Sequence, residues 1–366
     1  MKCLLRIFFF SIALTMVSSG TVFTNDAAWS QTTAVEKLYA DLAKLPAAER
    51  AKRIEEGARK EGKLILINCW RGTIGQDSDK LFRSRYPWLK LEAIDIGSQD
   101  AAERLYTEET AGRHLTDTVS GMAVLDLSII LDKNLAATYS TPAASKILKQ
   151  YQRLSDPKHL WTSFTWSEHG IVYNTKLLSP ADAPNSWDNL CNPKYKGQIS
   201  FDPLEVRFLT NLYKMMGDEK LQKWLECIGK NNPIIQRGHT TRLELMLAGD
   251  HAIGGDQYLY QGMLNKKKKP DTPFGVVWSA PILVIAECAI INKNTEHPYA
   301  AALYVDWLLS DESQNYIASV YRGPVTRKHP YMPEDVVLVG EEFPSSLEII
   351  ERVSNYWKKY MGPRSY

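Results

Sequence analysis

The chain has 366 residues, of which 44% are hydrophobic and 23% charged, with 44 lysines and arginines against 42 aspartates and glutamates. This composition excludes a mainly disordered protein, because disorder requires low hydrophobicity together with high net charge. The formal net charge of +2 is too small for a dedicated nucleic-acid-binding protein, which needs a clustered basic excess. The length predicts roughly two domains with well-filled cores.

The beginning of the chain has the features of a cleaved export signal. Lys2 and Arg6 precede an apolar run that ends at Val17, and Ala28-Trp-Ser30 places small residues at the two positions that a signal peptidase reads. The apolar run is shorter than the roughly 20 residues that span a bilayer. We therefore expect residues 1–30 to be a signal peptide and the mature chain to be a soluble periplasmic protein.

Four cysteines lie beyond this signal: Cys69, Cys191, Cys227 and Cys288. Their spacings match no zinc pattern of the C-x2-C type. Export permits disulfides, but a core of this size does not require them. The sequence therefore leaves two states open, buried free thiols or a bridge between Cys191 and Cys227.

Strand and helix patterns alternate along the mature chain. Two helices over 34–59, interrupted at Pro46, precede a strand at 63–68. The patterns that follow predict helices at 79–86, 101–111 and 145–151, and strands at 89–96 and 122–127. A second set predicts strands at 171–174, 197–201, 252–254, 274–278 and 282–291, and helices at 205–216, 219–228, 241–247 and 299–319. This alternation predicts an α/β fold with helices on both faces of a sheet, arranged in two lobes.

Six separated stretches occur in the order shown by one protein family. They are Glu55-Glu-Gly-Ala-Arg-Lys-Glu-Gly-Lys-Leu64, Phe82-Arg-Ser-Arg-Tyr-Pro87, Ile171-Val-Tyr-Asn-Thr175, Ser186-Trp-Asp-Asn-Leu-Cys-Asn-Pro-Lys-Tyr-Lys-Gly197, Leu247-Ala-Gly-Asp250 and His297-Pro-Tyr-Ala-Ala-Ala-Leu-Tyr-Val-Asp-Trp-Leu-Leu-Ser-Asp-Glu-Ser-Gln314. Over these stretches the chain resembles the extracellular solute-binding proteins of ABC importers, specifically the branch that contains ferric-ion-binding proteins. The segment 32–44 and the tail beyond Pro330 depart from the family pattern.

The resemblance implies a type 2 periplasmic-binding-protein fold, in which the ligand lies in a cleft between two α/β lobes that close by a hinge motion. We expect lobe one to contain 31–135 and 276–328, and lobe two to contain 136–275 and 329–366. The implied function is capture of a small-molecule solute in the periplasm and its delivery to an inner-membrane ABC permease. We expect a monomer with no nucleic-acid partner.

Ligand contacts in such a fold come from loops at the carboxyl ends of strands and from helix N-termini. The residues selected by this rule are Trp70, Arg71, Thr73, Ser98, Ser120, Asp202, Arg237, Asp256, Tyr258 and Tyr260. Arg71, Arg237 and Arg242 together suit a carboxylate or phosphate, because a guanidinium presents paired donors in one plane. A small polar or anionic solute is therefore the leading ligand class.

Ferric iron is the alternative ligand. The ferric relatives coordinate iron through adjacent tyrosines in the loop where this chain has Tyr258-Leu-Tyr260. Here Leu259 splits the pair, so only Tyr258 or Tyr260 is expected to face a metal. The loop after the first strand, where several ferric relatives supply a histidine, has none, and Arg71 would repel a trivalent cation. We expect no cofactor, and an iron ion would be a ligand, held directly or through an anionic chelator.

Catalytic signatures are missing from the sequence. There is no G-x-S-x-G, H-E-x-x-H or Walker A motif, and none of the seven histidines stands four residues from another. We therefore expect a binding protein rather than an enzyme. A periplasmic lyase or hydrolase on the same fold is the rival class, with His239, ahead of a predicted helix, as the residue placed for general acid chemistry or ligand contact.

Overall fold

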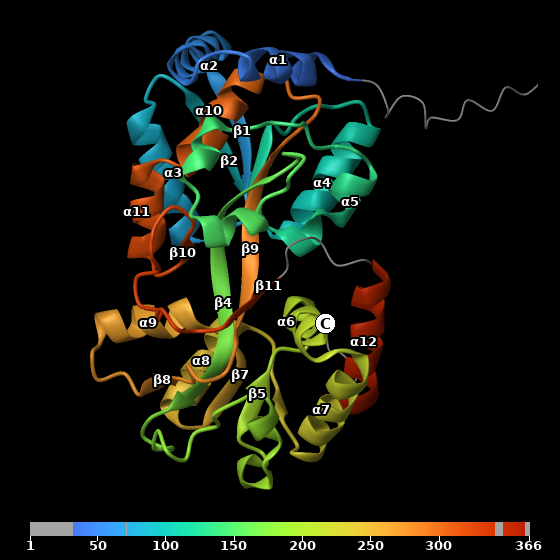
Figure 1. The fold of residues 1–366 in the computed structure, drawn as a ribbon, viewed down its shortest axis with the longest axis vertical. Coiled ribbons are helices and arrows are strands. Elements are labelled where there is room, and N and C mark those ends of the chain that lie inside the picture. Colours follow the sequence, from blue (N-terminus) through green and yellow to red (C-terminus); the bar gives the residue numbers. More distant parts are fainter. Residues whose placement is uncertain (1–31, 71, 341–346, 363–366) are drawn as a thin grey trace, which may run out of the picture. The chain divides into compact units, whose positions relative to one another are not determined.

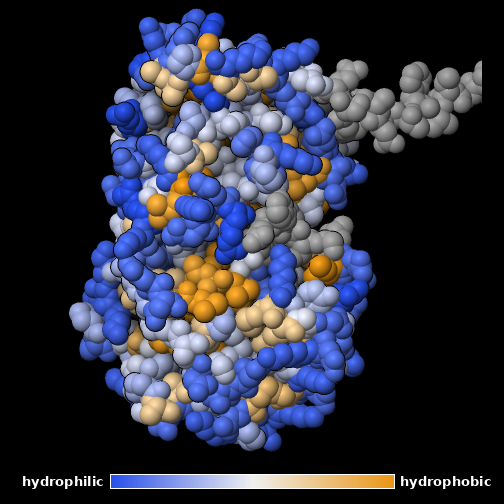
Figure 2. Space-filling model, viewed as in Figure 1, coloured by the Kyte–Doolittle hydropathy of each residue, from blue (hydrophilic) through white to orange (hydrophobic). Residues whose placement is uncertain are grey.

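The computed structural model describes residues 32–70, 72–340 and 347–362, and one mixed sheet runs through them (Figure 1). The predicted signal peptide at 1–30 lies outside the described residues. Among those residues, the helices are all too short or too polar to cross a membrane. Figure 2 shows hydrophilic side chains over most of one face of the molecule, with smaller apolar areas between them.

Two helices precede the first strand, as predicted. Helix α1 (Ala34–Ala43) begins with a capping box, in which the side chains of Thr33 and Glu36 each accept a hydrogen bond from the other's backbone N–H. Helix α2 (Ala47–Glu61) begins after Pro46 and ends at Gly62, where a φ of 68° closes the helix in the left-handed conformation that glycine tolerates best.

The first half of the sheet contains three parallel strands, β1 (Lys63–Asn68), β2 (Lys90–Asp95) and β3 (Thr118–Ala123), with α3 (Thr73–Arg85) and α4 (Ser98–Thr110) between them along the chain. The predicted strand 122–127 is wrong over most of its length. Strand β3 begins earlier, and 124–127 form a 3₁₀ turn that leads into the short helix α5 (Ser128–Asp132). The polar start of β3 concealed the strand, although Thr118 is buried and donates to the carbonyl of Ile290.

Two long antiparallel strands, β4 (Thr162–Asn174) and β9 (Ile282–Ile291), lie at the centre of the sheet, whose order is β2-β1-β3-β9-β4-β7-β5-β6. All 13 residues of β4 are buried, whereas the sequence predicted only 171–174 as strand. Polar residues at the start of β4 hid the pattern, but their hydroxyls are satisfied inside the protein. Thr165, for example, donates to the carbonyl of Gly323 at 3.0 Å.

The second half of the sheet contains the parallel strands β5 (Ile199–Phe201), β6 (Ile234–Ile235) and β7 (Ile253–Tyr258). The helices of this half are α6 (Val206–Met216), α7 (Asp218–Lys230), α8 (His239–Ala248) and α9 (Leu259–Lys268). The first three of these helices were predicted. The core of this half is rich in aromatic side chains, among them Trp187, Phe201, Phe208 and Trp224.

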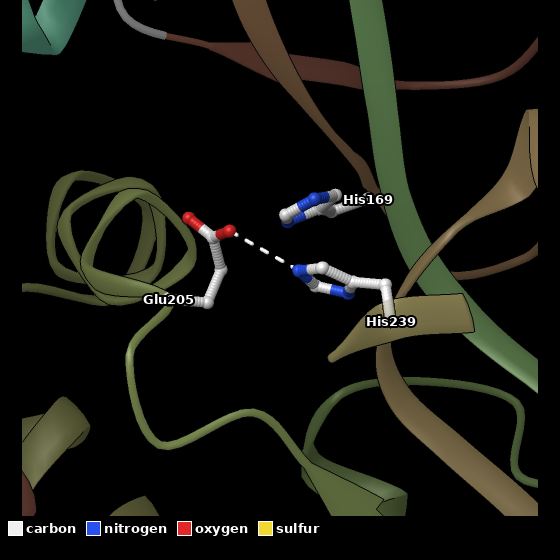
Figure 3. A group of neighbouring side chains, drawn as sticks. All are labelled: His169, Glu205 and His239. Atoms are coloured by element: carbon white, nitrogen blue, oxygen red, sulfur yellow. Dashed lines mark hydrogen bonds and ion pairs between the residues drawn. The ribbon is translucent and has the colours of Figure 1, made fainter. Parts of the chain in front are cut away.

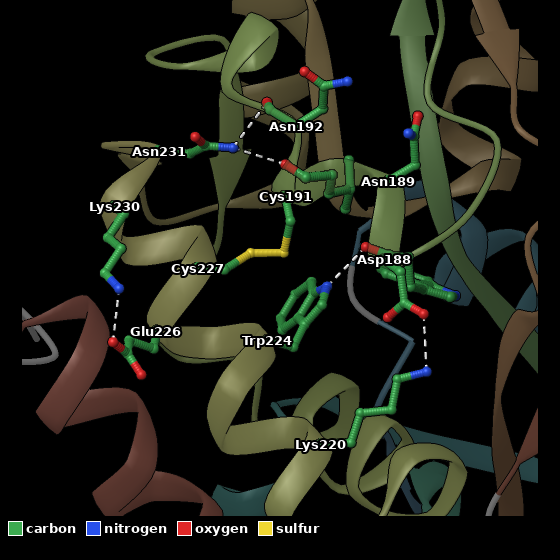
Figure 4. Close-up of a disulfide and its surroundings, with 12 residues drawn as sticks. Asp188, Asn189, Cys191, Asn192, Lys220, Trp224, Glu226, Cys227, Lys230 and Asn231 are labelled. Carbon is green, nitrogen blue, oxygen red and sulfur yellow. Dashed lines mark hydrogen bonds and ion pairs between the residues drawn. A yellow bond between two sulfur atoms is a disulfide. The ribbon is translucent and has the colours of Figure 1, made fainter.

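A disulfide joins Cys191 to Cys227, with a Cα–Cα distance of 5.6 Å (Figure 4). Of the two states left open by the sequence, the structure therefore has the bridge. Asn231, one turn beyond Cys227, donates to the carbonyl of Leu190 at 2.9 Å and so holds the same two segments together. The other two cysteines of the described chain, Cys69 and Cys288, are free.

Two predicted helices differ from the structure. The pattern at 299–319 is two helices, α10 (Pro298–Leu308) and α11 (Asp311–Ser319), because the Ser310 side chain caps a new helix by accepting from the Ser313 N–H. The segment 145–151 falls in two 3₁₀ turns, Pro142–Lys146 and Lys149–Leu154.

Strand β8 (Phe274–Val276), which was predicted, pairs with β4. The last part of the chain forms further elements that the sequence did not predict. Strand β10 (Gly323–Pro324) pairs with β4, and β11 (Leu338–Gly340) pairs with β9. Helix α12 (Leu347–Met361) packs on α6 and α7 and buries Val353 and Trp357.

Strands β4 and β9 extend between the two halves of the sheet (Figure 1). Between β3 and β4 the chain stays close to α10, because Tyr139 and Thr141 both donate to the carboxylate of Asp306 at 2.9 and 2.6 Å. The predicted lobe boundaries, 31–135 with 276–328 and 136–275 with 329–366, stay a prediction.

Candidate functional site

A cavity of about 750 Å³ lies at the carboxyl ends of the parallel strands. The first half of the sheet contributes the residues after β1 and the first turn of α4. The second half contributes the loop after β5, the first turn of α8 and the residues around the end of β7. Neither α4 nor α8 has a side chain that caps its N-terminus. The backbone N–H groups in the first turns of both helices therefore lack a side-chain capping partner at the cavity wall. This is the location that the strand-end rule predicted.

Six of the ten predicted site residues line this cavity: Trp70, Ser98, Asp202, Arg237, Tyr258 and Tyr260. The structure does not bring three others to it. Thr73 is exposed on α3, Ser120 is buried within β3, and Asp256 is buried within β7. Arg71 lies outside the described residues.

Asp256 misses the cavity because it forms a buried ion pair. Its carboxylate lies 2.5 Å from the guanidinium of Arg242, and neither side chain is exposed. Burial raises the pKa of Asp256 to about 6, although Arg242 opposes this shift. Arg242 also donates to the carbonyl of Ser200 at 3.2 Å. The expectation that Arg242 helps to bind an anionic solute is therefore wrong, because its guanidinium is used inside the second half.

Tyr258 and Tyr260 both line the cavity, with ring centroids 5.6 Å apart. The prediction that only one of them faces the site is wrong. It took Leu259 to separate the two side chains, whereas β7 ends at Tyr258 and α9 begins at Leu259. Residues i and i+2 share a face even in an extended segment, so the intervening Leu259 does not direct the two tyrosines apart.

The loop after β5 supplies a charged network that the sequence analysis missed. Arg207 donates from Nε to Glu205 at 2.9 Å and lies 3.5 Å from Asp126. On the other side of Glu205, the His239 Nε2 atom lies 3.2 Å from the carboxylate. Burial raises the pKa of Glu205, but Arg207 and the His239 hydrogen bond outweigh it and hold that pKa well below its usual range. Glu205 stands three residues beyond the predicted Asp202, so extending the strand-end rule by one turn would have found it.

A second missed group connects Arg322, Glu287 and Trp70. Arg322 lies 2.6 Å from the Glu287 carboxylate, to which the Trp70 indole N–H also donates. The guanidinium lies between two aromatic rings, 4.7 Å from the centroid of Trp70 and 4.8 Å from that of Tyr260. One signal was present in the sequence, because Glu287 is a single charge inside the apolar run of β9.

The cavity wall carries five carboxylates, Asp100, Asp126, Asp202, Glu205 and Glu287, against three arginines, Arg207, Arg237 and Arg322. Two of these arginines are already ion-paired, Arg207 with Glu205 and Arg322 with Glu287. The wall is therefore net acidic, and it favours a cationic ligand over an anionic one.

Three side chains beside the cavity have the ligand atoms and the proximity needed to hold a metal ion. His169 of β4, Glu205 before α6 and His239 at the start of α8 offer ligand atoms that lie within 4.8 Å of one another. Figure 3 shows the two imidazole rings one above the other, both beside the Glu205 carboxylate. The sequence analysis selected only His239 of these three, and it expected tyrosines rather than histidines as metal ligands.

A family model described as bacterial extracellular solute-binding protein matches residues 128–338. The major ferric iron-binding protein of Neisseria meningitidis serogroup B is 22% identical over 256 residues, which cover 66% of this chain and 70% of that protein.

Two solved structures give the same TM-score of 0.68. One is the Trichodesmium protein IdiA (FutA) in complex with iron and citrate, at 17% identity, covering 82% of this chain and 100% of that one. The other is the periplasmic binding protein AfuA of Actinobacillus pleuropneumoniae with fructose-6-phosphate bound, at 19% identity, covering 82% and 98%. These likenesses confirm the predicted two-lobed α/β fold.

Proposed function

Because the chain belongs to the bacterial extracellular solute-binding protein family, we propose that its solute is iron, taken up as ferric ion or as a ferric chelate. The Neisseria relative is a ferric iron-binding protein, and the Trichodesmium structure holds iron with citrate. This proposal replaces the generic anionic solute that the arginine pattern favoured. Iron is cargo here, bound in the cavity and released from it.

The observation that carries the proposal is the set of donors on the cavity wall. Tyr258, Tyr260, Glu205 and His239 line one continuous surface, with the carboxylate 3.2 Å from the imidazole. Phenolate and carboxylate oxygens are hard anionic donors, which suit a small trivalent cation. The net acidic charge of the wall also favours a cation, because a bound iron ion would compensate the buried negative charges.

The same surface explains how binding would be coupled to closure. Trp70 follows β1 in the first half of the sheet, whereas Tyr258 and Glu205 belong to the second half. A ligand held from both sides makes its full set of contacts only when the halves approach, so it shifts the population toward the closed form. Delivery to an inner-membrane ABC permease, a periplasmic location and a monomeric state belong to this proposal as well.

An anionic organic solute is the second candidate. It is favoured by Arg237, an exposed guanidinium on the cavity wall beside the first turn of α8, and by the sugar phosphate bound to AfuA. The same residue could hold the anionic part of a ferric chelate. If an anion binds, Arg237→Ala should weaken it by roughly 1.5–3 kcal/mol, the usual contribution of a hydrogen bond to a charged group.

The test is ferric titration of the purified chain. Fe³⁺ is supplied as a nitrilotriacetate complex, and visible absorption is followed for the charge-transfer band that an iron-bound phenolate gives. We expect a band at one iron per chain in the wild type. Tyr260→Phe, which removes one hydroxyl, should weaken the band and the affinity. Tyr213→Phe is the matched control, because Tyr213 lies on α6 outside the cavity wall and accepts from Arg352.

Absence of the band, with calorimetric binding of fructose-6-phosphate instead, would transfer the assignment to the anionic solute. Conversion of a bound solute into product would favour the rival lyase or hydrolase. Stoichiometric binding with unchanged solute excludes that class.

A further inference from the structure

We propose that His169, Glu205 and His239 form a binding site for a divalent first-row transition-metal ion such as Zn²⁺ (Figure 3). Two imidazoles and one carboxylate are the ligand set that holds zinc in many catalytic sites, with further positions left for water or another ligand. The proposed ferric donors are mainly oxygen, whereas this set is mainly nitrogen. The inference therefore extends the metal chemistry of the cavity and stands whether or not ferric iron is the cargo.

His169 provides the observation that points to a ligand. Its side chain is 0% exposed, and neither ring nitrogen has a hydrogen-bond partner. A buried polar atom without a partner is unfavourable, and native proteins leave few of them. The aromatic neighbours of His169, Tyr258 at 4.0 Å and His239 at 5.2 Å between ring centroids, pack on its ring but do not satisfy its nitrogens. A metal ion in the space beside Glu205 would satisfy one of them.

The distances are close to those that a tetrahedral ion requires. Zinc–nitrogen and zinc–oxygen bonds of about 2.1 Å place neighbouring ligand atoms about 3.4 Å apart. The His239 and Glu205 ligand atoms are already 3.2 Å apart. The three ligand atoms lie within 4.8 Å of one another, so side-chain rotation over little more than 1 Å would bring His169 into range.

The surroundings define which proton a metal ion must replace. Arg242 donates to Nδ1 of His239 at 2.8 Å, and because a guanidinium cannot accept, Nε2 carries the ring proton and donates it to Glu205. The ion would take the place of this proton between the two side chains, and the proton passes to solvent. His239 would then be an imidazolate, whose negative charge the Arg242 guanidinium stabilises through its hydrogen bond to Nδ1.

The two arginines beside the site do not exclude a cation from it. Arg207 lies 3.5 Å from Asp126 in addition to Glu205, and Arg242 lies 2.5 Å from Asp256. Each guanidinium therefore keeps a carboxylate partner when Glu205 and His239 bind the ion. Because Glu205 and His239 also belong to the proposed ferric donor set, the two ions should exclude each other.

The experiment uses the complete mature chain without an affinity tag, stripped of metal and titrated calorimetrically with Zn²⁺ alone. We expect one site, and His169→Gln should weaken Zn²⁺ binding at least about tenfold. His114→Gln is the matched control. His114 pairs with Glu109 at 2.9 Å, but no third ligand completes that pair among the described residues, so its loss should leave Zn²⁺ affinity unchanged.

Two further measurements keep the outcomes distinct. Tyr260→Phe should weaken the ferric charge-transfer band and leave Zn²⁺ binding intact, so failure of the ferric proposal and failure of this site are separable. If His169→Gln does not fold, as judged by near-UV circular dichroism, Co²⁺ added to the wild type decides. Intense visible bands of a four-coordinate, nitrogen-ligated ion support the site. Weak bands of hydrated Co²⁺, absent Zn²⁺ binding or an unaffected folded His169→Gln would overturn it.

Discussion

Replacing Asp306 by asparagine should make the stability of the protein less sensitive to a rise in pH from about 4 to 7. The Asp306 carboxylate is partly buried on α10, and one of its oxygens, Oδ1, accepts both the Tyr139 and the Thr141 hydroxyl. Burial raises its pKa from 3.8 to about 6, against the lowering effects of those two hydrogen bonds and of Arg50. Asparagine keeps an oxygen that can accept both hydroxyls and removes the ionisation.

The sign follows from proton linkage. A carboxyl whose pKa is higher in the folded than in the unfolded state stabilises the fold fully below its unfolded pKa, and this contribution is lost as the pH rises through the folded pKa. A rise from 3.8 to about 6 corresponds to roughly 3 kcal/mol at full burial. Solvent screening of a partly buried group reduces this free energy. We therefore expect the free energy of unfolding of the wild type to fall by about 2 kcal/mol relative to that of Asp306→Asn between about pH 4 and pH 7.

Urea unfolding, followed by tryptophan fluorescence at intervals from pH 4 to pH 8, measures this difference. Asp79 and Asp256, whose pKa values are also raised to about 6 by burial, are common to both proteins and cancel in the comparison. Asp271→Asn, at an exposed position before β8, is the control and should follow the wild-type profile. Parallel pH profiles for Asp306→Asn and the wild type would refute the reasoning.

Two further changes test the second half of the sheet and the cavity wall. Cys191→Ser should lower the free energy of unfolding by about 3–4 kcal/mol, because the bridge closes a loop with a sequence separation of 36. Equal urea midpoints for the oxidised and the reduced wild type would contradict this prediction. Gly121→Ala should cost about 1–3 kcal/mol and alter near-UV circular dichroism, because Gly121 has a φ of 72° and its added Cβ would lie 2.6 Å from Cδ1 of Trp70. An unchanged spectrum and urea midpoint would contradict this prediction, because Trp70 would then have moved with no loss of stability.

The sequence determined the fold class and the position of the binding region. Alternating helix and strand patterns, together with motifs such as Ser186–Gly197, were sufficient because helix periodicity and family motifs are local along the chain. The strand-end rule located the cavity for the same reason, since it depends only on where each strand ends. Six of the selected residues line the cavity, from Trp70 to Tyr260.

Tertiary structure decided how those residues are used. Arg242 and Asp256 neutralise each other inside the protein, although each is separately a reasonable ligand contact in the sequence. Arg322 and Glu287 meet from distant segments, and no local pattern records such a pair.

The last decision concerns the metal ligands. His169 lies in a strand whose polar residues concealed it, and Glu205 and His239 follow different elements of the second half. They come close together only when β4, β7, β5 and β6 join one sheet, because side chains from separate segments meet only through long-range pairing. Local sequence therefore determined where a ligand binds, and the folded arrangement decided which charges remain available to bind it.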